Sequence, residues 1–214
     1  MSIEKMRKNY TMAGLRKKDV DPDPWVQFKN WFHQARQDDL PDWVEVNAMT
    51  LSTTDGKGGI SSRVVLFKGA DEGRLFFYTN YQSVKAQQMA ACPTVSLCFF
   101  WPHLQRQVRI VGTVEKTDRQ RSQQYFATRP RGSQLGAHTS EQSSVVESRE
   151  VLQQRMDDLE KQYADQEVPC PDDWGGYEVT PEHFEFWQGR ESRLHDRICY
   201  RHNQDGWTIH RLAP

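Results

Sequence analysis

The sequence predicts a mainly β domain with inserted helices (α+β), in which antiparallel strands close into a barrel. Short runs of apolar, β-branched and aromatic residues recur through residues 48–114 and again through residues 183–211. Turn-forming strings separate these runs, as in DGKGG at residues 55–59 and DEG at residues 71–73. Only a few of the intervals have the periodicity of a helix. Many short strands with few helices between them are typical of a barrel.

One compact domain is expected at residues 25–214, because no internal repeat or low-complexity linker divides the chain. Residues 1–24 are polar and end in the string DPDP, so we expect them to form a mobile N-terminal arm. A helix should follow, with Asp23 as its cap and Pro24 at its first position. Aromatic residues then recur at helical spacing: Trp25, Phe28, Trp31 and Phe32.

The other elements are expected in the following order. Strands are predicted at residues 48–53, 63–68, 75–79, 94–100 and 107–114, and a last group at 183–188, 197–201 and 207–211. In the 107–114 strand, Val108 and Ile110 share a face with Gly112. Helices are predicted at residues 83–91, 118–128 and 145–162, the first of which stops before Pro93.

The composition excludes several classes of protein. The 214 residues have a mean hydropathy of −0.84, and no apolar run approaches the roughly 20 residues of a membrane-spanning helix. The N-terminus lacks the apolar segment of a secretory signal. A formal net charge of −1 offers no basic surplus for nucleic acid. The four cysteines show no metal-ligand spacing, so we expect reduced thiols in a cytoplasmic protein and no metal.

One group of cationic and hydroxyl side chains is predicted at strand ends and at a helix start. Arg63 and Lys68 bracket the apolar string VVLF, the pair Tyr78 and Thr79 ends the next strand, and Lys85 lies in the first turn of the helix that Ser83 opens. A helix N-terminus with nearby cations suits a phosphate group. The alternative is that these charges are solvated ends of strands and helices.

A second group lies in the string YFATRPRGSQLGA at residues 125–137. Because Arg129-Pro130-Arg131 cannot lie inside a helix, we expect the helix to end there and to present two guanidinium groups and Ser133 at a turn, beside Tyr125. Guanidinium groups match the geometry of phosphate. Arginines that merely complement a helix dipole remain an alternative.

A third group packs arginines, His195 and Trp187 into residues 187–197, where Asp196 could stabilise a charged His195. Ser192 does not sit in a nucleophile elbow, which argues against a serine hydrolase. The phosphate-binding loop, the dinucleotide-binding glycine motif and the zinc-protease motif are absent from the sequence. Their absence argues against a nucleotide triphosphatase, a Rossmann enzyme and a zinc protease. The three groups together suit a phosphorylated aromatic ligand.

These segments resemble the pyridoxamine 5'-phosphate oxidase family. The matching strings occur in the family's order: RVVLFK (63–68), FFYTN (76–80), RQV (106–108), YFATRPRGSQLGA (125–137), EQSS (141–144), WGGY (174–177), FWQGRESRLHDR (186–197) and RLAP (211–214). The resemblance implies an FMN-binding split β-barrel and a homodimer with FMN at its interface. One departure is Val84, which stands where the family usually has an arginine.

The resemblance also implies roles for particular residues. FMN would be held by Arg63, Val64, Val65, Leu66, Lys68, Tyr78, Thr79, Ser83, Lys85, Gln107, Gln142, Ser143, Trp187 and Arg197. The substrate would be held by Arg7, Tyr10, Lys68, Tyr125, Arg129, Ser133, Arg193 and His195. Of these, Arg193 and His195 would be catalytic, with Arg193 positioning the reacting carbon.

The implied reaction converts pyridoxamine 5'-phosphate and pyridoxine 5'-phosphate to pyridoxal 5'-phosphate. A hydride leaves the substrate for FMN, O2 accepts the electrons, and H2O2 is produced, with NH3 from the amine substrate. A non-catalytic split-barrel flavin binder and a pyridoxal 5'-phosphate carrier are the alternatives.

Overall fold

The computed structural model describes residues 2–6, 9–12, 14–37 and 39–214. Within them the strands form one antiparallel sheet: β1 (Ala48–Thr54), β2 (Ile60–Leu66), β3 (Ala70–Asp71), β4 (Arg74–Asn80), β5 (Thr94–Trp101), β6 (Arg106–Lys116), β7 (Trp174–Gln188), β8 (Asp196–Asn203) and β9 (Gly206–Leu212). The helices are α1 (Pro24–Ala35), α2 (Val84–Ala91), α3 (Arg119–Ala127), α4 (Arg131–Thr139) and α5 (Arg149–Gln162). Short 3-10 turns lie at Ile3–Lys5, Lys17–Asp19 and Glu191–Arg193.

The long strand β7 organises the sheet. The strand order is β2-β1-β5-β6-β7-β4-β3, and β8 and β9 continue from β7. The first half of β7 pairs with β4 and its second half pairs with β8, while β6 runs beside both halves. The register of β6 and β7 shifts at Gly112, where a side chain would overlap the backbone of Thr180. The sheet therefore bends at this point and splits toward two different neighbours.

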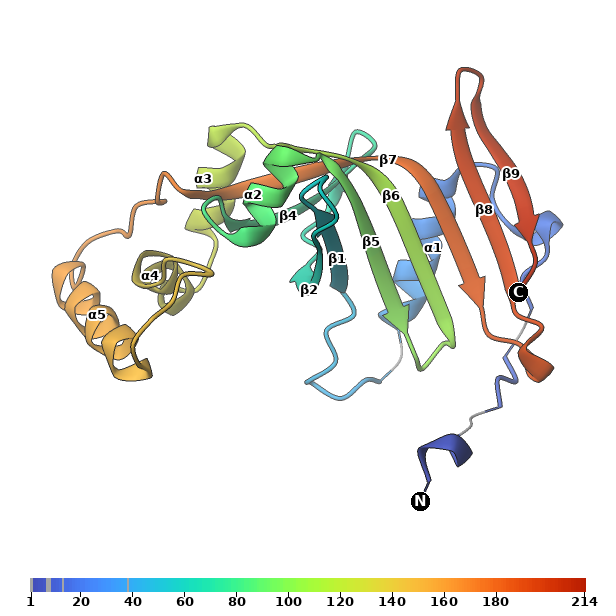
Figure 1. Ribbon diagram of the computed structural model, residues 1–214, viewed down its shortest axis with the longest axis horizontal. Coiled ribbons are helices and arrows are strands. Elements are labelled where there is room, and N and C mark those ends of the chain that lie inside the picture. Colours follow the sequence, from blue (N-terminus) through green and yellow to red (C-terminus); the bar gives the residue numbers. More distant parts are fainter. Residues whose placement is uncertain (1, 7–8, 13, 38) are drawn as a thin grey trace.

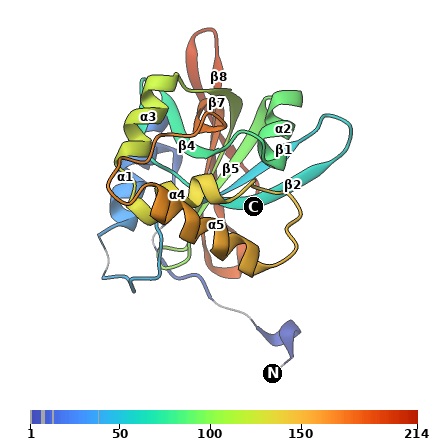
Figure 2. The ribbon, with the colours of Figure 1, turned by 90° about the vertical axis from the view of Figure 1, so that its left-hand side faces the viewer.

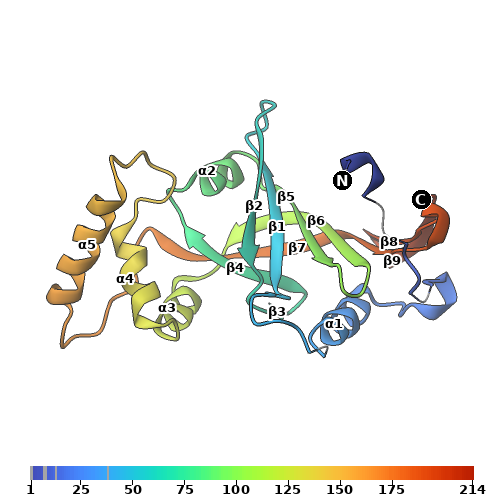
Figure 3. The same cartoon turned by 90° about the horizontal axis from the view of Figure 1, so that it is seen from below.

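The core lies between one face of this sheet and α1. Asp23 accepts a hydrogen bond from the Trp25 amide at 2.8 Å, which caps α1 as expected. Phe28 of α1 packs on Phe99, and Trp31 packs on Phe186. In Figure 3, α1 lies at the bottom of the view and the tip of the β1–β2 hairpin extends to the top, away from α1. The alternation predicted for β6 is confirmed, since Val108 and Ile110 are fully buried.

Helices α3, α4 and α5 gather at the end of the sheet remote from the β8–β9 hairpin (Figure 1), whereas α2 packs Ala86 and Met89 into the main core. Figure 1 shows α3, α4 and α5 at one end, and Figure 2 looks onto that end. A second, smaller apolar cluster fixes them there, formed by Phe126, Leu135, Val168 and Trp174. None of the helices in the described residues is long and apolar enough to cross a membrane.

Several predicted boundaries were wrong. The strand expected at 63–68 begins at Ile60 and ends at Leu66, because the chain turns through Gly69 at a φ of 135°. The helix expected from residue 145 begins at Arg149. Ser133, expected at a turn after Arg129-Pro130-Arg131, lies instead in helix α4, because Leu135 packs this helix into the second cluster. The expected strand 183–188 is only the last part of β7, whose first half carries two glycines.

Candidate functional site

A cavity of about 720 Å³ lies where β2, β4, α2, α3 and α4 meet. Its lining joins the first two groups that the sequence singles out. The lining residues are Arg63, Val64, Val65, Leu66, Lys68, Tyr78, Thr79, Lys85, Tyr125, Thr128, Arg129, Pro130, Ser133, Gln142 and Trp174. The fold therefore brings together residues that lie up to 111 positions apart, from position 63 to position 174.

Lys85 forms one end of this cavity, which we call the Lys85 end. Its ammonium group donates to Gln142 Oε1 at 2.6 Å and to Thr79 Oγ1 at 3.1 Å. Burial, together with the nearby charge of Arg63, lowers the pKa of Lys85 to about 8. Both partners are neutral, so the charge of Lys85 is available to an anion.

Arg63 lies beside Lys85 and is also bonded only to neutral groups. One of its Nη atoms donates to Leu51 O at 3.1 Å and to Thr53 Oγ1 at 2.7 Å, and the other donates to the Ser61 hydroxyl. Burial lowers the pKa of the guanidinium. Three of its five N–H donors are engaged by described residues, which leaves two for a ligand.

Arg129 and three stacked rings form the other end of the cavity, the Arg129 end. Tyr78 and Tyr125 stack at 3.8 Å between ring centroids, and Trp174 lies parallel to both. The Arg129 guanidinium rests 4.6 Å from the Trp174 ring. Its Nη1 atom is buried and has no hydrogen-bond partner among the described residues. Burial lowers the pKa of this guanidinium as well.

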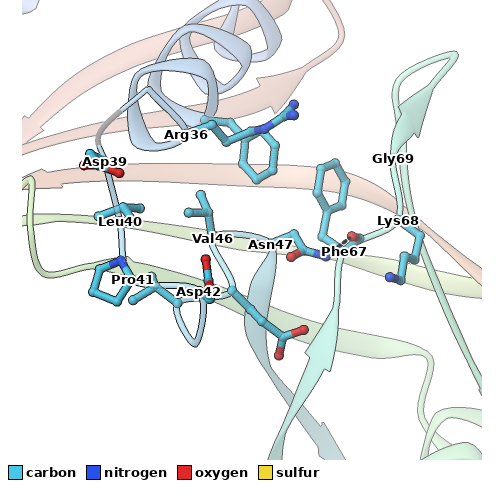
Figure 4. A pocket seen from close by; sticks show the side chains of 13 residues that line it. Arg36, Asp39, Leu40, Pro41, Asp42, Val46, Asn47, Phe67, Lys68 and Gly69 are labelled. Atoms are coloured by element: carbon cyan, nitrogen blue, oxygen red, sulfur yellow. Dashed lines mark hydrogen bonds between the residues drawn. The ribbon is translucent and has the colours of Figure 1, made fainter.

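Lys68 stands between this cavity and a second one of about 730 Å³. Figure 4 shows Lys68 and Asn47 at one side of the second cavity and Arg36 and Asp39 across from them. The Asn47 side chain donates to Phe67 O at 3.0 Å, which holds the backbone just before Lys68. The Lys68 side chain is exposed and lines both cavities.

The third predicted group lies at the far end of β7. The rings of Tyr10, Trp187 and His195 contact one another, with centroids 4.7 to 5.7 Å apart. His195 Nδ1 accepts a hydrogen bond from the Arg190 amide at 3.1 Å, so a neutral His195 carries its proton on Nε2. Tyr10, Arg193 and His195 border a cavity of about 440 Å³.

Backbone strain marks the loop that carries Arg193. Ser192 and Arg193 have φ values of 55° and 60°, in the left-handed region that side chains disfavour. The Arg193 side chain is exposed. Two consecutive strained residues present this guanidinium outward, and such strain is concentrated at functional loops.

Gln107, Trp187 and Arg197 occupy one row across β6, β7 and β8. The Arg197 guanidinium donates from Nε to Glu185 Oε1 at 2.9 Å and from Nη1 to Ala213 O at 2.9 Å. Burial alone would raise the pKa of Glu185, but hydrogen bonds from Arg197 and Arg109 lower it overall. Arg197 is therefore held by a fixed partner beside Trp187.

Other predicted residues have local partners. The fully buried Ser83 hydroxyl donates to Asn80 O at 2.8 Å, and Ser143 Oγ accepts from the Val84 amide at 3.4 Å. Ser143 has a φ of 77°. Arg7 lies outside the described residues.

Two expectations about single side chains were wrong. Arg131 faces away from the cavity, because it begins α4 and donates to the carbonyl oxygens of Gln166 and Tyr163. Asp196 does not bond His195. It accepts from the Leu15 amide at 2.8 Å and pairs with Arg211, so it holds the N-terminal arm instead.

Sequence reasoning missed three residues of the first cavity: Thr128, Pro130 and Trp174. Thr128 and Pro130 flank Arg129, and Trp174 begins the string WGGY, so the matching strings could have indicated them. Among the described residues, no group of three or more His, Cys, Asp or Glu side chains could hold a metal ion.

The first cavity and the ring cluster formed by Tyr10, Trp187 and His195 lie at opposite ends of β7. Trp174 at the start of β7 belongs to the first cavity, and Trp187 near its end belongs to the ring cluster. Thirteen residues of extended strand span roughly 40 Å. Figure 1 shows the same separation, with α3 and α4 far from the start of β8.

Two family models match this chain. One, described as pyridoxamine 5'-phosphate oxidase, matches residues 36–163, and the other, described as the pyridoxine 5'-phosphate oxidase C-terminal dimerisation region, matches residues 174–214. Among curated relatives, a pyridoxine/pyridoxamine 5'-phosphate oxidase of Rhodopirellula baltica is 54% identical, covering 100% of this chain and 97% of the relative. One of Gloeothece citriformis is 50% identical, covering 100% and 99%.

Solved structures share the fold. PhzG from Burkholderia lata, in complex with tetrahydrophenazine-1-carboxylic acid, aligns with a TM-score of 0.87 at 25% identity, covering 97% of this chain and 100% of that one. A pyridoxamine 5'-phosphate oxidase-related, FMN binding protein from Nostoc punctiforme aligns with a TM-score of 0.70 at 17% identity, covering 90% and 98%. The expected antiparallel split barrel with inserted helices is confirmed.

Proposed function

This chain belongs to the pyridoxamine 5'-phosphate oxidase family, and we propose that its two residue clusters, contributed by two copies of the chain, form the family's active site. It is an FMN-dependent oxidase that converts pyridoxine and pyridoxamine 5'-phosphate to pyridoxal 5'-phosphate. The chemistry that FMN supplies when bound is hydride acceptance from the substrate and reoxidation by dioxygen. The protein supplies binding, orientation and charge.

The Lys85 end of the cavity binds the FMN phosphate. Lys85 and Arg63 are partly buried cations whose partners are all neutral, and Thr79 and Gln142 add polar groups between them. A phosphate dianion would take up the unused donors of both cations. Residues Val64–Leu66 of β2 border the same cavity and would offer the isoalloxazine ring apolar contacts.

The Arg129 end binds the substrate phosphate, and the observation that carries this assignment is the buried Nη1 atom of Arg129, which has no hydrogen-bond partner in the described part of the chain. A buried donor without a partner costs free energy, which a ligand oxygen would recover. Lys68, Tyr125 and Ser133 line the same cavity and supply a further cation and two hydroxyls. A cavity with two separate anion-binding ends suits a phosphorylated substrate beside a phosphorylated cofactor.

Residues of a second copy complete the site. One chain holds its ring cluster roughly 40 Å along β7 from its cavity, so Arg193 and His195 cannot reach the cavity of their own chain. The C-terminal region, residues 174–214, matches a dimerisation region and contains both residues. In a twofold dimer, each cavity would receive Gln107, Trp187, Arg193, His195 and Arg197 from the other chain.

Arg193 and His195 then act on the substrate. Arg193 orients the reacting carbon and stabilises developing charge with its exposed guanidinium. His195, fixed by the Arg190 amide, presents its Nε2–H as a hydrogen-bond donor. The arm brings Tyr10 over this pair and closes the site from one side.

The four free cysteines support a cytoplasmic location.

Mixing two variants, each nearly inactive at pyridoxamine 5'-phosphate concentrations below the native KM, tests the shared site. Arg193→Ala should keep FMN but lose turnover, and Arg129→Met should lose substrate affinity. Unfolding and refolding the two together makes about half of the dimers hybrids, each with one intact site of two, so activity should return to about a quarter of the native value. Activity that stays at the level of the separate variants would contradict a site shared between chains.

A further inference from the structure

The guanidinium of Arg63 is held by two hydroxyl groups that share a single acceptor. Thr53 Oγ1 accepts from Arg63 at 2.7 Å, and the Ser61 hydroxyl accepts from the other Nη atom. Both hydroxyls donate to the same atom, Gln88 Oε1, each at 2.6 Å. Thr53 is buried, and Ser61 and Gln88 are half-buried, so water has limited access to this network.

The chemistry of the amide oxygen fixes the direction of every hydrogen bond in the network. A carbonyl oxygen only accepts, so the hydroxyl protons of Thr53 and Ser61 must both point at Gln88. Their lone pairs then face the Arg63 guanidinium, which only donates. Without Gln88, each hydroxyl can turn its proton away from this arrangement and compete as a donor. Gln88 therefore fixes the roles of the two hydroxyls, so that both accept hydrogen bonds from Arg63.

Gln88 also connects Arg63 to the other cation at this end of the cavity. It lies three residues after Lys85 on α2, and residues three apart share a helix face. One face of α2 thus carries Lys85 into the cavity and holds Arg63, which comes from β2, through Thr53 and Ser61. The spacing between the two cations depends on this contact between helix and strand.

We infer that Gln88 is a positioning residue for Arg63 and thereby determines the affinity of the site for the phosphate of FMN. The inference rests on the proposed function, in which Arg63 binds that phosphate. Gln88 itself does not line the cavity, so it acts only through the two hydroxyls.

The test compares FMN with riboflavin, which has the same ring system and no phosphate, in titrations of the apoprotein followed by flavin fluorescence. Gln88→Met keeps the length of the side chain and removes the acceptor. Loss of the acceptor should weaken FMN binding about tenfold and change riboflavin binding less than twofold. Gln87→Met, an exposed position on the same helix, is the matched control and should change neither.

Further variants separate the possible failures. Arg63→Met should reduce the preference for FMN over riboflavin, and if it does not, the proposed role of Arg63 is wrong. If Arg63→Met reduces the preference and Gln88→Met does not, only the inference about Gln88 is overturned. Equal weakening of both flavins by Gln88→Met would indicate general damage to the fold and would also overturn it.

A double-mutant cycle tests whether Gln88 acts through the two hydroxyls. In a Thr53→Val, Ser61→Ala background the two hydroxyls are gone, so the acceptor has nothing left to orient. Adding Gln88→Met should then leave FMN affinity unchanged. A further loss of FMN affinity in this background would show that Gln88 acts by another route.

Discussion

FMN affinity should fall as the pH rises from 7 to 9, because Lys85 loses its proton in the apoprotein within this range. Burial and the charge of Arg63 lower the pKa of Lys85 to about 8. Bound phosphate raises that pKa, so binding takes up a proton wherever the free lysine is neutral. The phosphate itself is already dianionic above pH 7, since its second pKa is about 6.

The size of the effect follows from the fraction of protonated lysine. We take a pKa of about 8 for Lys85 in the free protein and full protonation of Lys85 in the complex. The dissociation constant of FMN is then proportional to 1 + 10^(pH − 8). That factor is about 1.1 at pH 7 and about 11 at pH 9, so FMN should bind about tenfold more weakly at pH 9. Fluorescence titration of the apoprotein at several pH values measures it.

Lys85→Arg is the matched control, because arginine stays charged throughout this range. Its FMN affinity should be flat from pH 7 to 9, and riboflavin should bind native protein with little pH dependence. A flat profile for FMN on the native protein would refute the argument, since Lys85 would then be protonated at pH 9 without a ligand. A profile that Lys85→Arg reproduces would assign the titration to another group.

Three further outcomes are expected. Arg129→Met should lower kcat/KM for pyridoxamine 5'-phosphate by about 10- to 100-fold, mainly through KM, and leave FMN affinity unchanged. The control is Arg131→Met, which removes a guanidinium bonded outside the cavity and should leave KM unchanged. Gly189→Ala places a Cβ about 2.8 Å from the Tyr10 ring and should raise KM by displacing the arm while FMN still binds; Gly132→Ala, with nothing within 4 Å, is its control in the same steady-state assay. Val84→Arg adds a cation at the exposed first position of α2 and should lower the FMN dissociation constant severalfold in the same titration, and an unchanged constant would mean that the present cations suffice.

The sequence was informative where a residue's chemistry and its local context agree. Asp23 and Pro24 predict the start of α1, and the chemistry of Arg63, Thr79 and Lys85 predicts that these residues lie together, as they do in the lining of the first cavity. The sequence was uninformative where contacts between distant segments determine whether an element forms. Helix α4 depends on Leu135 reaching a cluster built by Phe126 and Trp174, which no local pattern reveals.

Side-chain partners were the least predictable part of the site. Asp196 precedes Arg197 and follows His195, so a contact with His195 was a reasonable expectation. His195 lies in the loop before β8, however, whereas Asp196 is the first residue of β8, and its side chain bonds the Leu15 amide from the N-terminal arm and Arg211 from β9. Pairs separated by 181 positions, such as Leu15 and Asp196, are set by topology and cannot be read from spacing.

The partners of a cation separate the arginines and lysines that we propose to bind phosphate from structural ones. Arg109 and Arg211 are paired with buried carboxylates, which neutralise their charge and fix them in place. The three cations assigned to phosphates, Arg63, Lys85 and Arg129, contact only hydroxyls, amides, carbonyls and aromatic rings among the described residues.

This difference has a physical reason. A carboxylate partner would compete with phosphate for the same donors, whereas neutral partners orient a cation and leave its charge uncompensated. Burying a cation without a carboxylate partner costs free energy, and burial accordingly lowers the pKa at all three positions. Arg106 shares this pattern, but it rests 4.4 Å from the Trp31 ring and lines neither end of the cavity. A buried cation without a carboxylate therefore indicates a phosphate site only where it also faces an open cavity, and the first cavity meets that condition at both ends.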